Sequence, residues 1–238
     1  MAEGWLFLLR WFHFLAGITW IGLLYYFNLV QTPFFASAEP AVRTGMIAGG
    51  LVGRALWWFR WGAMLTFITG WLYVLDMIFR RYGGLQPFFS QPYGWSIFIG
   101  GILGSLMWFN VWFVIWPAQK VVMASAAQVS KGGQAIPEAA ARGQRSGFAS
   151  RTNTLLSIPM LFFMGAASHF PSLFTPTARP AKITMIVVFA IILAIVEWNA
   201  LVGTTGPGKK ALATVNSTLW SGFVLTAILA IALKIVFM

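Results

Sequence analysis

The sequence contains no cysteine and very little charge. None of the 238 residues is Cys, which excludes disulfides, thiolate metal sites, iron–sulfur clusters and covalently attached c-type haem within these residues. Histidine is almost as scarce, so His13 and His169 are the only strong nitrogen ligands that the sequence offers a cofactor.

Charged residues make up 9% of the sequence, against about a quarter in ordinary soluble domains. Hydrophobic residues make up 59%, and the mean hydropathy is +0.77. A chain of this composition has too little polar surface to cover a soluble globule. We therefore interpret it as an integral membrane protein.

Acidic residues are the rarer of the two charge signs. There are 16 Lys and Arg against 5 Asp and Glu, a net charge of +11. In a soluble chain such an excess would indicate nucleic-acid binding. Here the basic residues fall mostly in the gaps between apolar stretches, where the positive-inside rule and anionic lipid headgroups account for them. We expect membrane lipids as partners and no nucleic acid.

About 20 consecutive apolar residues cross a bilayer as a helix. The sequence predicts an all-α, polytopic membrane helix bundle of about six transmembrane helices, forming one integral membrane domain over residues 1–238. The expected spans are 5–30, 57–79, 93–116, 152–169, 181–202 and 217–236. Residues 117–151 are predicted to form a cytoplasmic loop with a short helix near Glu138–Arg142.

The basic residues also predict the orientation. Ten lie in or beside the first, third and fifth connections, and six lie on the opposite side. By the positive-inside rule the odd-numbered connections face the cytoplasm, and both termini lie outside.

Ionisable residues inside apolar spans are costly and are therefore candidate functional or structural groups. Asp76 and Arg80 are four residues apart, the spacing of an ion pair on one helix. Arg60 and Glu197 lie at matched depth in the second and fifth spans, and we predict that they pair. Asn110 is expected to hydrogen-bond between helices.

The two histidines have small residues beside them on their own helical faces. Gly17 lies four residues after His13, and Gly165 lies four residues before His169. Small neighbours permit either close helix packing or the approach of a flat macrocycle. In the predicted topology both imidazoles lie toward the outer side, where they could be the axial ligands of one b-type haem, with Arg10 near a propionate. The alternative is that each histidine hydrogen-bonds a neighbouring helix.

Several stretches together resemble the membrane-embedded N-terminal domain of the bacterial urate oxidase (urate hydroxylase) family, whose longer members end in a cytochrome c domain. They are LRWFHFLAGITWIGLLYYFN, WWFRWGAMLTFITGWLYVL, FNVWFVIWPAQKVV, GQRS and LLSIPMLFFMGAASHFP, in this order over about residues 5–200. The positions that match the family pattern are His13, Trp20, Arg60, Trp61, Asn110, Pro117, Gln119, Arg145, Ser146, Pro159, His169 and Pro171.

The sequence also departs from the family. Members typically carry further histidines after the first helix and before the fourth, where this sequence reads GGLVGRALWWFR and RSGFASRTNTLL. We expect a short form of the family, because these 238 residues contain no C-x-x-C-H motif for a cytochrome c domain.

The resemblance therefore implies a redox-associated subunit of the bacterial inner membrane, taking part in electron transport. Such a subunit would work with a separate c-type cytochrome or a larger respiratory or oxidase complex, and it could hold one haem b. One alternative is a haem-free accessory or structural subunit of a larger membrane protein complex. A second is a membrane-bound, urate-oxidising enzyme.

Overall fold

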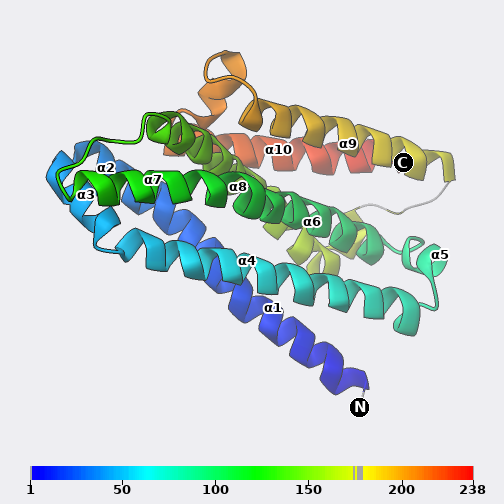
Figure 1. Ribbon diagram of the computed structural model, residues 1–238. Coiled ribbons are helices and arrows are strands. Elements are labelled where there is room, and N and C mark those ends of the chain that lie inside the picture. The colour runs from blue at the N-terminus through cyan, green and yellow to red at the C-terminus, as the bar shows by residue number, and fades with distance from the viewer. Residues whose placement is uncertain (1, 174, 176–178, 238) are drawn as a thin grey trace.

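The computed structural model describes residues 2–173, 175 and 179–237, and these residues are almost entirely helical (Figure 1). Within them, six long helices follow one another. The first three are α1–η1–α2 (Ala2–Tyr25, Tyr26–Gln31, Thr32–Ser37), α4–η2 (Leu51–Asp76, Met77–Arg81) and α6–η3–α7 (Pro92–Phe109, Asn110–Ile115, Trp116–Val129). The other three are α8 (Ala139–His169), α9 (Arg179–Leu201) and α10 (Val215–Val236).

Short elements join the long helices at two opposite ends of the bundle (Figure 1). At one end lie α3 (Pro40–Ala48), the turn before α8, and the 3-10 helix η5 (Pro207–Leu212). At the other end lie both termini and α5 (Leu85–Phe88); η4 (Pro171–Leu173) follows α8. The odd-numbered connections thus share one end, and both termini lie at the other, as six alternating helices require.

In the described part of the chain five of the long helices are long and apolar enough to cross a membrane, one fewer than the six spans that the sequence predicts. Among the described residues these are Glu3–Ser37, Leu51–Arg81, Pro92–Val129, Pro180–Leu201 and Val215–Val236. The fourth long helix, α8, does not reach the same apolarity. It packs against α6, α7, α9 and α10, so much of its surface contacts protein and can be polar.

The predicted loop 117–151 is wrong in its extent. The third helix continues through α7 to Val129, and α8 begins at Ala139, so residues 130–138 alone connect them. Both extensions are rich in alanine, the strongest helix former, and they continue the helices beyond the most apolar residues. The short helix expected near Glu138–Arg142 is the first turn of α8.

Two wide π-helical turns interrupt the first and third helices, and each precedes a proline. Segment η1 ends two residues before Pro33, and η3 ends two residues before Pro117. Proline has no N–H for the helix, and its ring clashes with the carbonyl four residues earlier. The wider turn relieves this conflict. Asn110 is the first residue of the wide turn η3, and its side chain is completely buried in the bundle.

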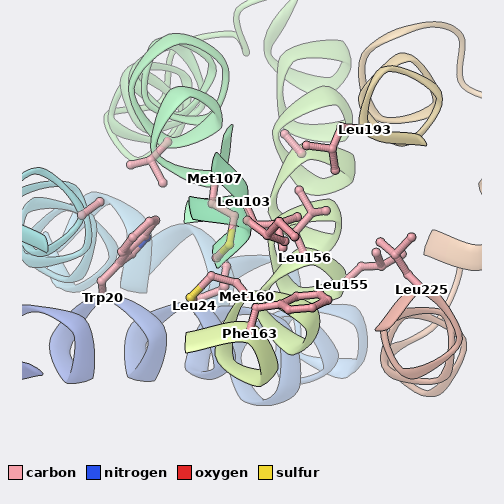
Figure 2. Close-up of a cluster of buried hydrophobic side chains, with 14 of the residues drawn as sticks. Trp20, Leu24, Leu103, Met107, Leu155, Leu156, Met160, Phe163, Leu193 and Leu225 are labelled. Carbon is pink, nitrogen blue, oxygen red and sulfur yellow. The ribbon is translucent and has the colours of Figure 1, made fainter. Parts of the chain in front are cut away.

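The apolar core surrounds α8 (Figure 2). Leu155, Leu156, Met160 and Phe163 of α8 are buried at its centre. The buried side chains that meet them from the neighbouring helices include Trp20 and Leu24 of α1, Leu103 and Met107 of α6, Leu193 of α9 and Leu225 of α10. Helix α8, the least apolar of the six long helices, is therefore the central helix of the bundle.

Candidate functional site

A stripe of polar side chains runs along α8 and bonds to the helices on either side. The four positions are 146, 150, 153 and 157, whose 4-3-4 spacing places them on one helical face. The hydrogen bonds are Gln119 to Ser146 at 2.8 Å, Asn28 to Ser150 at 2.8 Å, Asn110 to Asn153 at 3.0 Å and Tyr25 to Ser157 at 2.9 Å. Alternate positions thus bond to the third helix and to the first helix.

Asn153 of this stripe belongs to a carboxyl–amide cluster with Asn110 and Glu197, of which Glu197 is only partly buried. Asn110 Nδ2 donates to Asn153 Oδ1 at 3.0 Å and to Glu197 Oε2 at 3.2 Å. Asn153 Nδ2 in turn donates to the backbone carbonyl of Met107 at 2.9 Å. Both asparagine side chains are completely buried. The cluster joins the third helix, α8 and α9 inside the apolar part of the bundle.

Two oxygens of the cluster have no hydrogen-bond partner among the described residues. They are Asn110 Oδ1 and Glu197 Oε1, and both atoms are buried. Both hydrogens of Asn110 Nδ2 are already used, so the amide has no donor left for either oxygen. A buried polar atom left without a partner is costly, so this pair of oxygens calls for an explanation.

Glu197 also lines a surface cleft of about 580 Å³ between α4, α6 and α9. The cleft is mainly apolar and aromatic. Phe67 and Trp108 stack in its wall with ring centroids 4.2 Å apart, and the Trp71 indole donates to Ser105 at 2.9 Å. The carboxyl group therefore bonds to the Asn110 amide beside an open cleft of aromatic and aliphatic side chains.

The predicted pairing of Arg60 with Glu197 is wrong. The Arg60 guanidinium lies 3.8 Å from the centre of the Trp116 ring and 5.2 Å from that of Trp112, while Glu197 bonds to Asn110. In the described part of the chain no ion pair joins Arg60 to Glu197. Equal depth was the basis of that prediction, but the two side chains turn toward different neighbours.

The ion pair between Asp76 and Arg80 is confirmed. Arg80 Nη1 lies 3.1 Å from Asp76 Oδ1 on the same helix. The arginine side chain is largely exposed, so this pair belongs to the bundle surface and contributes little stability.

His13 is half-buried between α1 and α4. Its Nδ1 donates to the carbonyl of Thr66 at 2.9 Å, which leaves Nε2 without the ring proton. The ring packs directly over Gly70, where an added Cβ would lie 2.8 Å from His13 Cε1. Gly70 is therefore the glycine that makes room for this imidazole, whereas Gly17 stands only in ordinary contact with Thr66.

His169 lies at the exposed end of α8. Tyr25 of α1 and Ser157 of α8 form a hydrogen bond with each other. His13 precedes Tyr25 by 12 residues and His169 follows Ser157 by 12 residues. Because α1 and α8 run in opposite directions, both histidines lie toward the same end of the bundle. The histidines are thus at similar depth. Twelve residues are about three and one-third turns, so each ring points about a third of a turn away from the α1–α8 contact.

The other residues predicted to contact the haem have these surroundings in the structure. Arg10 bonds to the Tyr73 hydroxyl on α4 and lies 5.0 Å from the centre of that ring. An added Cβ at Gly165 would meet open space. Among the described residues no group of three or more His, Cys, Asp or Glu could hold a metal ion.

Comparison with protein families matches the family described as urate oxidase N-terminal over residues 77–233, which is well over half of the chain. The chain belongs to the urate oxidase N-terminal family. This confirms the resemblance seen in the sequence. Searches of curated proteins and of solved structures gave no significant match.

The matched residues contain the whole carboxyl–amide cluster and His169, together with Gln119 and Ser146. His13, Trp20, Arg60 and Trp61 precede residue 77, so the likeness of the first two helices to this family stays a prediction. The family relation therefore rests on the part of the bundle built around α8.

Sequence reasoning missed three residues of these sites: Asn153, Thr66 and Gly70. Asn153 left only a partial signal, because 153 and 157 lie in the predicted span 152–169 whereas 146 and 150 of the 4-3-4 series fall in the predicted loop. Thr66 acts through its backbone carbonyl, and Gly70 acts through the absence of a side chain. Neither role leaves a mark in the sequence.

Proposed function

We propose that this protein is a redox-associated subunit of the bacterial inner membrane that works with a separate electron carrier. The observation that carries the proposal is the Glu197 carboxyl, held by Asn110 inside an apolar span and within the residues that match the urate oxidase N-terminal family. An ionisable group at this depth is costly and is retained mainly where it has a function.

An oxidation needs an acceptor for the electrons, and these 238 residues contain no cysteine for a c-type haem or an iron–sulfur cluster. The proposal therefore includes a separate c-type cytochrome or a larger membrane complex as the electron acceptor. The apolar outer faces of α1, α9 and α10 suit a lipid environment, in which such a complex would assemble.

The finer form of the proposal is one b-type haem on this chain. His13 supports it, because its Nδ1 is fixed by a backbone carbonyl and Nε2 remains available to iron, the usual arrangement of a ligating imidazole. A haem shared with His169 would require both rings to turn toward the α1–α8 contact. The haem would supply one-electron transfer, while the chain would supply ligand orientation and an apolar surrounding.

A reduced-minus-oxidised absorption spectrum of the purified protein tests the haem directly. If the haem is present, the wild-type protein shows low-spin b-type bands. His13→Ala removes or strongly perturbs them, while Phe14→Ala, on the exposed side of the same turn, leaves them intact. A folded, haem-free preparation from cells with ample haem would refute the haem and favour the accessory-subunit alternative.

The urate-oxidising alternative draws on the family name and has its own assay. Urate and oxidised cytochrome c are added to the protein in lipid nanodiscs, and reduction of the cytochrome is followed. Turnover that is lost in Glu197→Ala and kept in Asp76→Asn would establish this chain as the oxidising enzyme. Without turnover, the chain remains a partner subunit.

A further inference from the structure

We propose that Glu197 is a proton-binding site inside the membrane, holding a proton on Oε1 that it shares with Asn110 Oδ1 as an acid–amide pair. This inference deepens the proposed function by giving the buried cluster a chemical task. The inference rests on the proposed redox role only for the purpose of the proton. Proton binding itself can be measured without any redox partner.

The first argument is the count of donors. Asn110 Nδ2 has two hydrogens, one directed to Asn153 Oδ1 and the other to Glu197 Oε2. What remains on these two neighbouring side chains is one oxygen each, Asn110 Oδ1 and Glu197 Oε1, both buried and without a partner in the described residues. Two acceptors cannot satisfy one another unless a proton lies between them.

The second argument is the geometry of the pair. A carboxylic acid and a carboxamide are complementary, since each presents one donor and one acceptor on the same edge. The bond from Asn110 Nδ2 to Glu197 Oε2, at 3.2 Å, is already one half of that pair. A proton on Oε1 supplies the second half and satisfies both unpartnered oxygens at once.

The third argument is the absence of a counter-charge. The elements packed against α9 or lining the cleft are α8, α10, η5, α4 and α6, and none brings a cation to the carboxyl. Helix α6 carries no charged residue, Lys234 lies in the last turn of α10, at the end away from Glu197, and Arg54, Arg142, Arg145 and Lys210 are exposed. Arg60 of α4 stacks on Trp116, Arg151 of α8 donates to the carbonyls of Leu212 and Ala213, and Lys209 of η5 bonds to the carbonyls that end α9. No described cation lies within ion-pair distance of Glu197. In this apolar setting the neutral acid is favoured over a carboxylate.

The other acidic side chains make the proposal directly testable. Of the five in the sequence, Glu3, Glu39 and Glu138 are exposed, and Asp76 is paired with Arg80. Glu197 is thus the one acidic side chain whose described surroundings favour the protonated form. An infrared carboxylic-acid signal at neutral pH can therefore be assigned to a single residue.

The experiment is infrared spectroscopy of the protein in lipid nanodiscs at neutral pH. The wild-type protein should show a carboxylic-acid C=O stretch that shifts in heavy water. The band should disappear in Glu197→Gln, change frequency in Asn110→Ala and stay unchanged in the control Asp76→Asn. Because glutamine matches the shape of the protonated acid and can donate to Asn110 Oδ1, Glu197→Gln should keep a wild-type melting temperature.

Three results would overturn the proton site: no acid band in the wild type, a band that survives in Glu197→Gln, or a band that appears only when sodium is removed. The last would mean that a cation occupies the space between the two oxygens. A missing acid band leaves the redox role standing. The opposite outcome is also possible: the acid band is present, but the assembly purified from native membranes contains no redox centre. That result would refute the redox role and leave the proton site standing.

Discussion

The hydrogen bond between Asn110 and Asn153 should stabilise the bundle by a measurable amount. Asn110→Ala removes two interhelical hydrogen bonds, to Asn153 and Glu197. Asn153→Ala removes the bond from Asn110 and the bond to the Met107 carbonyl. At about 0.6–1.7 kcal/mol per bond in a membrane protein, each single change should lower the free energy of unfolding by about 1–3 kcal/mol.

The double variant separates the shared bond from the rest. Because both single variants lose the same Asn110–Asn153 bond, the double variant should be more stable than the sum of the two losses predicts, by about 0.6–1.7 kcal/mol. The assay is reversible unfolding in mixed micelles, followed by tryptophan fluorescence. Asn216→Ala, an exposed asparagine on α10, is the control and should change stability by less than about 0.5 kcal/mol. If the stability loss of the double variant equals the sum of the two single losses to within about 0.3 kcal/mol, the hydrogen bond between Asn110 and Asn153 is refuted.

Three further predictions concern other parts of the bundle. Gly70→Ala should lower the free energy of unfolding by about 1–2 kcal/mol, because the new Cβ displaces His13 from its bond to Thr66. The control Gly104→Ala, where the new Cβ enters open space, should be neutral or stabilising in the same thermal melt. Lys209→Met should lower the free energy of unfolding by about 1.5–3 kcal/mol, because the buried ammonium group of Lys209 bonds to the carbonyls that end α9. The control Lys210→Met, at an exposed position, should leave stability almost unchanged in the same measurement. A C-terminal alkaline phosphatase fusion should be active and a fluorescent-protein fusion dark, because the basic residues place both termini outside; the opposite pattern would invert the topology.

Composition and the lengths of the apolar stretches were enough to predict the helix bundle and the order of its helices. Alternation between two ends also followed from the sequence, because each long helix returns the chain to the opposite end (Figure 1). The limits of α7 and α8 did not follow. Hydropathy marks the apolar part of a helix, while alanine-rich ends continue it further.

The partners of buried polar residues could not be predicted from depth alone. Asn110 was expected to bond between helices, and it does, but its partner Asn153 was not foreseen. Arg60 and Glu197 lie at similar depth and still bond to different groups. A side chain's direction turns by about 100° per residue along a helix, so small differences in rotation decide which side chains meet. The same rotation separates His13 from His169.

The measurement that tests the proposed redox role most directly is a haem and redox analysis of the assembly purified from native membranes. The protein is isolated in mild detergent through an affinity tag, and its reduced-minus-oxidised spectrum and pyridine haemochrome are recorded together with the identities of its partners. The account predicts a redox centre that copurifies in fixed ratio with this chain, on the chain itself or on a partner subunit. An intact, stable assembly that contains no redox centre would contradict it.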